Sequence, residues 1–102
     1  MASSRPISPV ITRAAGQVGS HLSTWRRIEG ITAAELAARA GVSTDTVSRA
    51  ERGDPSVGFG KILAMARVLD IMPQVIDAFD PATTEMGRMR LMQSVPKRVR
   101  RA

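Results

Sequence analysis

The spacing of Ala37, Gly41 and Val47 constrains the fold of this chain more than any other feature of its sequence. Two short helices can cross closely only where a small residue lies at the crossing. A tight turn between them needs a left-handed residue, which glycine adopts without strain. Gly41 follows Ala37 by four residues and precedes Val47 by six. This pattern predicts two packed helices joined by the turn 41–43.

Capping signals predict where these two helices begin. Thr32 is followed three residues later by Glu35, which is a capping box, so we expect a helix over 33–40. Ser43 caps a second helix, expected over 44–52. The residues expected to hold the unit together are Leu36, Ala37, Gly41 and Val47.

The rest of the chain is predicted to be helical, with no strand. Val18, Leu22, Trp25 and Ile28 recur at helical spacing, which predicts a long helix over 10–29, and Trp25 is expected in the core. Glycines weaken its first half, so we expect the firm helix to begin near Gly19. Further helices are expected over 58–69, 73–79 and 83–92, with Pro96 ending the last.

Composition limits the classes of function. The chain has 102 residues, a net charge of +6 and no cysteine, which excludes thiolate catalysis and fits a reducing cytoplasm. No apolar run approaches the ~20 residues of a membrane span, so we expect a cytoplasmic protein. We find no metal-ligand spacing and no nucleophile–base pair, and expect neither enzyme nor cofactor. The positive charge is concentrated in a basic tail: Lys97, Arg98, Arg100 and Arg101.

The stretch from Ile31 to Ser43, followed by that from Thr46 to Gly53, resembles the Cro/CI-type (Xre family) helix-turn-helix regulators. The resemblance covers roughly Gly19 to Phe79. It implies an all-α, five-helix, lambda-repressor-like domain that binds double-stranded DNA. We expect a flexible arm over 1–9, a DNA-binding domain over 10–79 with its helix-turn-helix at 32–53, and an extension over 80–102.

A narrower resemblance gives an alternative function. The segment 55–60, the pair Asp80-Pro81 and the closing segment 96–101 look like HipB-like antitoxin regulators. That resemblance implies binding to a HipA-like kinase toxin, with DNA binding serving autoregulation. The main expectation is a transcriptional regulator that acts as a repressor in the manner of the broader family.

The predicted second helix of the unit should enter the major groove and read bases. One face of this helix carries Thr44, Asp45, Ser48 and Arg49. The planar guanidinium of Arg49 can donate a pair of hydrogen bonds to O6 and N7 of guanine. In the resembled family the positions of Thr44, Asp45 and Arg49 read bases. Contacts with phosphate are expected from Thr32, Ala33, Ser43, Thr46, Arg52, Ser56, Gly58, Gly60 and Lys61.

The resemblance also implies a structural ion pair and a dimer. Arg26 and Glu51 occupy the positions of a partly buried pair that joins the first helix to the end of the third. A homodimer would bind a palindromic operator, with half-sites about one helical turn apart. Candidate dimer residues are Phe79, Met86, Met89 and Met92.

Overall fold

The computed structural model describes residues 6–99, and their side chains as far as Gln93. This part of the chain is all-α, with no strand among the described residues. The helices are α1 (Pro9–Glu29), α2 (Ala33–Ala40), α3 (Thr44–Glu51), α4 (Phe59–Val68), α5 (Met72–Phe79), the 3₁₀-helix η1 (Pro81–Thr83) and α6 (Glu85–Val99). The predicted all-α class is confirmed.

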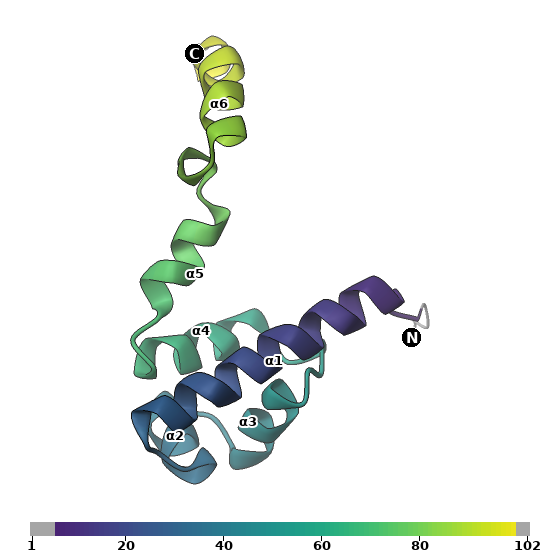
Figure 1. Ribbon diagram of the computed structural model, residues 1–102, viewed down its shortest axis with the longest axis vertical. Helices are drawn as coiled ribbons and strands as arrows, with labels where there is room; N and C mark the ends of the chain where they lie inside the picture. Colours follow the sequence, from purple (N-terminus) through teal and green to yellow (C-terminus); the bar gives the residue numbers. More distant parts are fainter. Residues whose placement is uncertain (1–5, 100–102) are drawn as a thin grey trace. The chain divides into compact units, whose positions relative to one another are not determined.

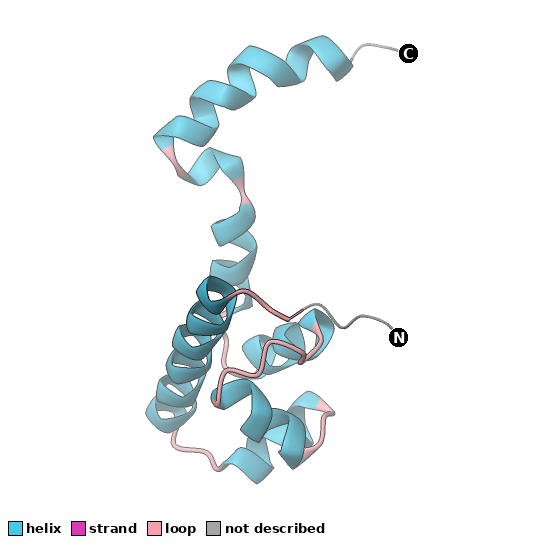
Figure 2. Ribbon diagram, turned by 90° about the vertical axis from the view of Figure 1, so that its right-hand side faces the viewer, coloured by secondary structure: helices cyan, strands magenta, loops and turns pink. Residues whose placement is uncertain are grey.

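The chain divides into two compact units, residues 1–71 and 72–102. In the first unit α1 lies across the three short helices, as Figures 1 and 2 show. Helix α2 packs on α3 and α4, and α1 packs on α3. The short α3 thus packs on both the long α1 and the short α2.

The core of the first unit is aliphatic. Leu36, Val47, Met65 and Leu69 are fully buried and come from α2, α3 and α4, with Leu69 just after α4. Burying such a side chain stabilises a fold by about 1.5–3 kcal/mol, so four of them account for much of the stability of a small domain. The other buried apolar residues are Leu22, Ala37, Ala50, Val57, Ala66 and Ile71.

Helix α1 begins within one residue of the predicted segment 10–29. Its first residue is Pro9, capped by the Ser8 side chain, so the expectation that glycines delay the firm helix to Gly19 was wrong. The glycines have a packing role. A Cβ on Gly19 would contact the carbonyl oxygen of Ala50 and lie 2.9 Å from the Gly53 nitrogen. Glycine therefore allows the backbones of α1 and α3 to touch.

The apolar stripe predicted along α1 is mostly not in the core. Leu22 is buried, but Trp25 is 36% exposed, and Val18 and Ile28 are 51% and 64% exposed. The prediction that Trp25 is a core residue was wrong.

The second unit contains α5, η1 and α6. Asp80 ends α5 and caps η1, accepting a hydrogen bond from the Ala82 N–H, as expected for the Asp80-Pro81 break. Gly87 in α6 lies so close to the Pro81 carbonyl that no Cβ would fit. The expectation that Pro96 ends the last helix was wrong, since α6 continues to Val99. The φ angle of proline is helical, so a helix can pass it with the loss of one N–H.

Candidate nucleic-acid interface

The turn between α2 and α3 has the predicted geometry. Gly41 is left-handed, with φ 74°, and the Val42 N–H donates to the Ala37 carbonyl at 3.0 Å. The capping box at the start of α2 is confirmed: Glu35 N donates to Thr32 Oγ1 at 3.0 Å and Thr32 N donates to Glu35 Oε1 at 2.8 Å. These caps fix the boundaries of α2 and so the place from which α3 starts.

The two faces of α3 differ sharply. Thr46, Val47 and Ala50 are buried against the rest of the unit. The opposite face carries Thr44 and Asp45, which are exposed, and Ser48 and Arg49, which are half-buried. The four residues predicted to read bases therefore lie together on the accessible side of this helix.

Arg49 is tied to the turn that follows α3. Its Nε donates to Asp54 Oδ2 at 3.0 Å, and its Nη2 donates to Ser56 Oγ at 3.1 Å. Asp45 lies on the same face, with Oδ2 4.0 Å from Arg49 Nη1, which is beyond hydrogen-bond distance. The sequence analysis missed Asp54, although an aspartate two residues before a serine is a signal for an Asx-turn.

Asp54 accepts hydrogen bonds at both carboxylate oxygens. Ser56 donates to Oδ1 from its hydroxyl at 2.7 Å and from its backbone N–H at 2.9 Å. These bonds, followed by the bond from Arg49, lower the pKa of Asp54 from 3.8 to about 2. The carboxylate thus stays ionised, and stays a partner for Arg49, through the physiological range.

We expect the stability that this carboxylate contributes to be lost at acid pH. Its pKa is lower in the folded chain than in the unfolded one, so its contribution is complete above pH 3.8 and declines as pH falls towards about 2. A carbon-13 titration of the Asp54 carboxyl group should have its midpoint near 2. In Ser56→Ala the midpoint should rise, and a wild-type midpoint at 3.8 would contradict the bonding described here.

The residues predicted to contact phosphate lie at the starts of α2, α3 and α4, just after α3 and within α3. Thr32 and Ala33 are at the start of α2, and Ser43 at the start of α3. Around the start of α4 are the exposed residues Ser56, Gly58, Gly60 and Lys61, and Arg52 is exposed after α3. Thr46 faces inward at 4% exposure, and its hydroxyl is bonded to Ser43 Oγ at 2.9 Å.

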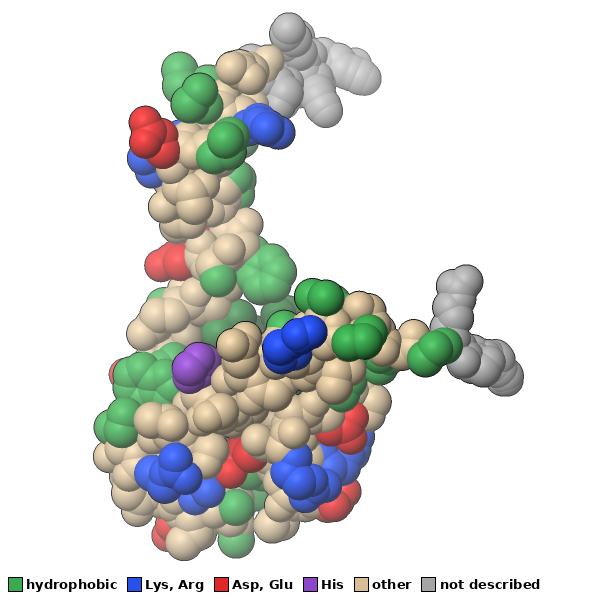
Figure 3. Space-filling view, turned by 45° about the vertical axis from the view of Figure 1, so that its right-hand side comes forward, with side chains coloured by type: hydrophobic (Ala, Val, Ile, Leu, Met, Phe, Trp, Pro, Cys, Tyr) green, Lys and Arg blue, Asp and Glu red, His purple; other side chains and the backbone are tan. Residues whose placement is uncertain are grey.

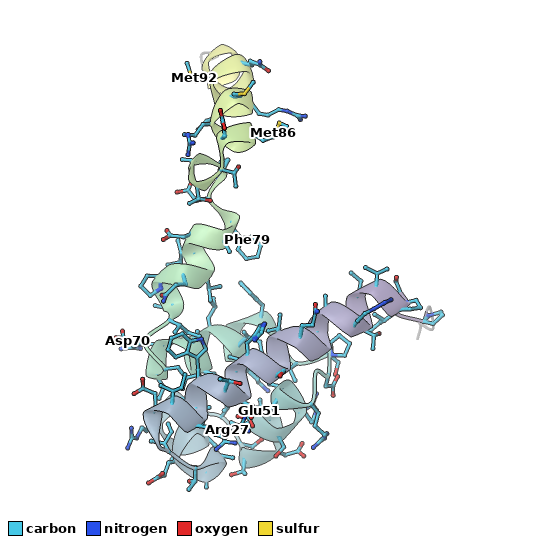
Figure 4. All side chains as sticks on the ribbon, in the orientation of Figure 1. Arg27, Glu51, Asp70, Phe79, Met86 and Met92 are labelled. Atoms are coloured by element: carbon cyan, nitrogen blue, oxygen red, sulfur yellow. The ribbon has the colours of Figure 1, made fainter. Side chains whose placement is uncertain are left out.

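Arg26 and Glu51 join α1 to the end of α3, where Figure 4 labels Glu51. Arg26 Nε and Nη2 donate to the two Glu51 carboxylate oxygens at 2.7 and 3.0 Å, and Nη1 donates to the Ile31 carbonyl at 3.0 Å. The hydrogen bonds that Arg26 donates to Glu51 raise the pKa of Arg26 above its ordinary value, against the opposing effect of burial. The pair fixes α3 to α1 and to the chain entering α2.

Charge on the first unit is mixed, with Lys and Arg side chains beside Asp and Glu in Figure 3. Of the predicted basic tail, the side chains of Lys97 and Arg98, and all of Arg100 and Arg101, lie outside the described residues. Within residues 6–99 no three His, Cys, Asp or Glu side chains are grouped so as to hold a metal ion. No described helix has the length and apolar character needed to cross a membrane.

Comparison with known families agrees with this geometry. Residues 17–79 match a family described as a helix-turn-helix domain, which includes α2, α3 and their turn. No curated protein and no solved structure matches the chain. Because the match spans more than half of the sequence, the chain belongs to this family of helix-turn-helix domains, whose implied partner is DNA.

Proposed function

We propose that the chain is a sequence-specific transcriptional regulator of the Cro/CI (Xre) type that acts as a repressor. The observation that carries the proposal is the two-sided character of α3. One side is buried on α1, α2 and α4, and the other presents Thr44, Asp45, Ser48 and Arg49 together. A helix held in this way can enter the major groove with its polar side against base edges.

Phosphate contacts would position α3 on the duplex. The first N–H groups of a helix have no backbone acceptor within it, and the capping box of α2 uses those of Thr32 and Glu35. The N–H groups of Ala33 and Ala34, at the start of α2, can therefore donate to a phosphate. Ser43, Arg52 and the segment around Gly58, Gly60 and Lys61 supply further donors on exposed backbone or side chains. Contacts of this kind carry affinity and make it dependent on salt, whereas α3 carries specificity.

A homodimer would place two such helices on one operator. The second unit carries exposed apolar side chains for this contact, of which Phe79, Met86 and Met92 are labelled in Figure 4. Met86 is 60% exposed, Met89 52% and Met92 79%. With two copies related by a two-fold axis, the selected DNA site would be palindromic.

Enrichment from random duplexes tests the proposal. We expect the wild-type chain to select a two-fold symmetric site, and Arg49→Ala to lose about 10- to 100-fold of its preference at one base pair per half-site. The measurement is a fluorescence titration of selected and scrambled duplexes at two salt concentrations. Background binding that weakens with salt should persist in Arg49→Ala, because phosphate contacts remain.

Binding of all duplexes alike, or of none, would contradict the regulator proposal. The HipB-like alternative would then be the one to test, by co-purification of the chain with a kinase encoded beside it. An antitoxin would form a stable complex with that kinase and suppress its phosphotransfer. A regulator without a toxin partner would do neither.

A further inference from the structure

A closed ring of hydrogen bonds holds one edge of the Arg49 side chain. The guanidinium donates through Nε to Asp54 and through Nη2 to Ser56, and the Ser56 hydroxyl donates to the same Asp54 carboxylate. The guanidinium donates both of its bonds, the carboxylate accepts both of its own, and the Ser56 hydroxyl accepts one bond and donates the other, so that its two bonds polarise and strengthen each other. All three side chains are consequently fixed by one another.

The backbone places Asp54 for this role. Gly53, with φ 84°, ends α3 and turns the chain back, so that the Asp54 N–H donates to the Arg49 carbonyl at 2.9 Å. Gly53 itself is packed on α1, where its Cβ would lie 2.5 Å from Gly16 Cα. The position of the carboxylate is therefore set by the packing of the unit and not by a mobile surface loop.

The ring leaves the Nη1–Nη2 edge of Arg49 without a hydrogen-bond acceptor, although Nη1 lies within ion-pair distance of Asp45. A guanidinium has five N–H donors in a planar fork. The ring uses Nε–H and one N–H of Nη2 on the inner edge, and Nη1 makes only the 4.0 Å approach to Asp45. The donors of Nη1 and the second N–H of Nη2 form the paired edge that matches O6 and N7 of guanine.

We infer that Asp54, assisted by Ser56, is a positioning residue that holds Arg49 with its Nη1–Nη2 edge free to read a base. This role rests on the proposed function of α3. A long arginine side chain loses much rotational freedom when it binds, and a site that is already ordered avoids that cost at the moment of binding. Asp54 thus contributes to specificity without touching DNA.

The test compares Asp54→Asn with Glu29→Gln. Both changes remove one negative charge, but Glu29 is exposed at the end of α1, away from the ring. Each variant is titrated with the duplex selected by the wild-type chain, and with that duplex changed at the base pair that Arg49→Ala stops selecting. Thermal unfolding is followed by circular dichroism for every variant.

We expect Asp54→Asn to lose about ten-fold of discrimination at that base pair only, while Glu29→Gln keeps it. The double variant Arg49→Ala with Asp54→Asn should discriminate no worse than Arg49→Ala alone, since both act on one contact. If Asp54→Asn does not fold, Ser56→Ala, which keeps the carboxylate, should show a smaller loss at the same base pair.

Three results would overturn the role. Discrimination like that of Glu29→Gln would show that the ring does not aim Arg49. A gain in affinity for the selected duplex beyond that of Glu29→Gln would show that Asp54 withholds Arg49 from DNA. If Asp54→Asn lost discrimination equally at every base pair, Asp54 would have a structural role alone. A wild-type chain without any preferred duplex would instead overturn the proposed function.

Discussion

Replacing Gly19 with alanine should destabilise the first unit by about 3 kcal/mol, close to the upper end of the cost of overpacking a core. The new Cβ would meet the carbonyl oxygen of Ala50 and lie 2.7 Å from the Glu51 oxygen and 2.9 Å from the Gly53 nitrogen. All three are backbone atoms, which cannot rotate away as a side chain can. Either α1 or the end of α3 must move, and the packing between them is lost.

Gly16 provides the matched control. It lies in the same helix one turn earlier, and a Cβ there meets nothing within 4 Å. Gly16→Ala should therefore stabilise the chain by roughly 0.5–1 kcal/mol, because alanine favours helix over glycine. For a domain of this size, the melting temperature shifts by about 4–8 °C for each kcal/mol of change in stability. The melting temperatures of Gly19→Ala and Gly16→Ala should therefore differ by more than ~10 °C. Equal melting temperatures would contradict the backbone contact.

Glu51→Ala should cost about 3 kcal/mol, the second large effect. The change leaves Arg26 with its charge, 17% side-chain exposure and only the Ile31 carbonyl as a hydrogen-bond partner. Removing one member of a buried pair costs about 3–5 kcal/mol, and the partial exposure of this pair places the effect at the lower end. Urea unfolding at neutral pH measures it.

Two further variants show whether the loss of stability in Glu51→Ala comes from the unpaired charge of Arg26. Glu29→Ala removes an exposed carboxylate and should change stability by no more than about 0.5 kcal/mol. The double variant of Arg26→Ala with Glu51→Ala should be less unstable than the sum of the two single changes, since no unpaired charge remains. Strict additivity would mean that the two side chains stabilise the fold independently.

The sequence predicts those parts of the fold that depend on neighbouring residues. The capping box of Thr32 and Glu35 and the left-handed Gly41 are local features, and the structure has both as expected. The placement of Trp25 and the start of α1 depend on contacts with distant segments, and those expectations were wrong. A glycine that weakens a helix and a glycine that admits another backbone look the same in one sequence.

In the candidate site, too, the sequence predicts what depends on local spacing and misses what depends on the path of the chain. The polar face of α3 follows from helical spacing, so Thr44, Asp45, Ser48 and Arg49 could be grouped before the structure was known. The tie from Arg49 to Asp54 spans five residues, which is not a spacing at which side chains meet on a helix. It exists only because Gly53 reverses the chain between them.

The contact at Gly19 also has a consequence for dynamics. Helices that meet through side chains can slide over one another by small adjustments of those side chains. At Gly19 the backbone of α1 touches the backbone of α3, and this part of the interface has no rotamer to change. Nitrogen-15 relaxation should therefore give order parameters of about 0.85 through both helices around this crossing. Helix α3 would then approach a duplex as a rigid extension of α1.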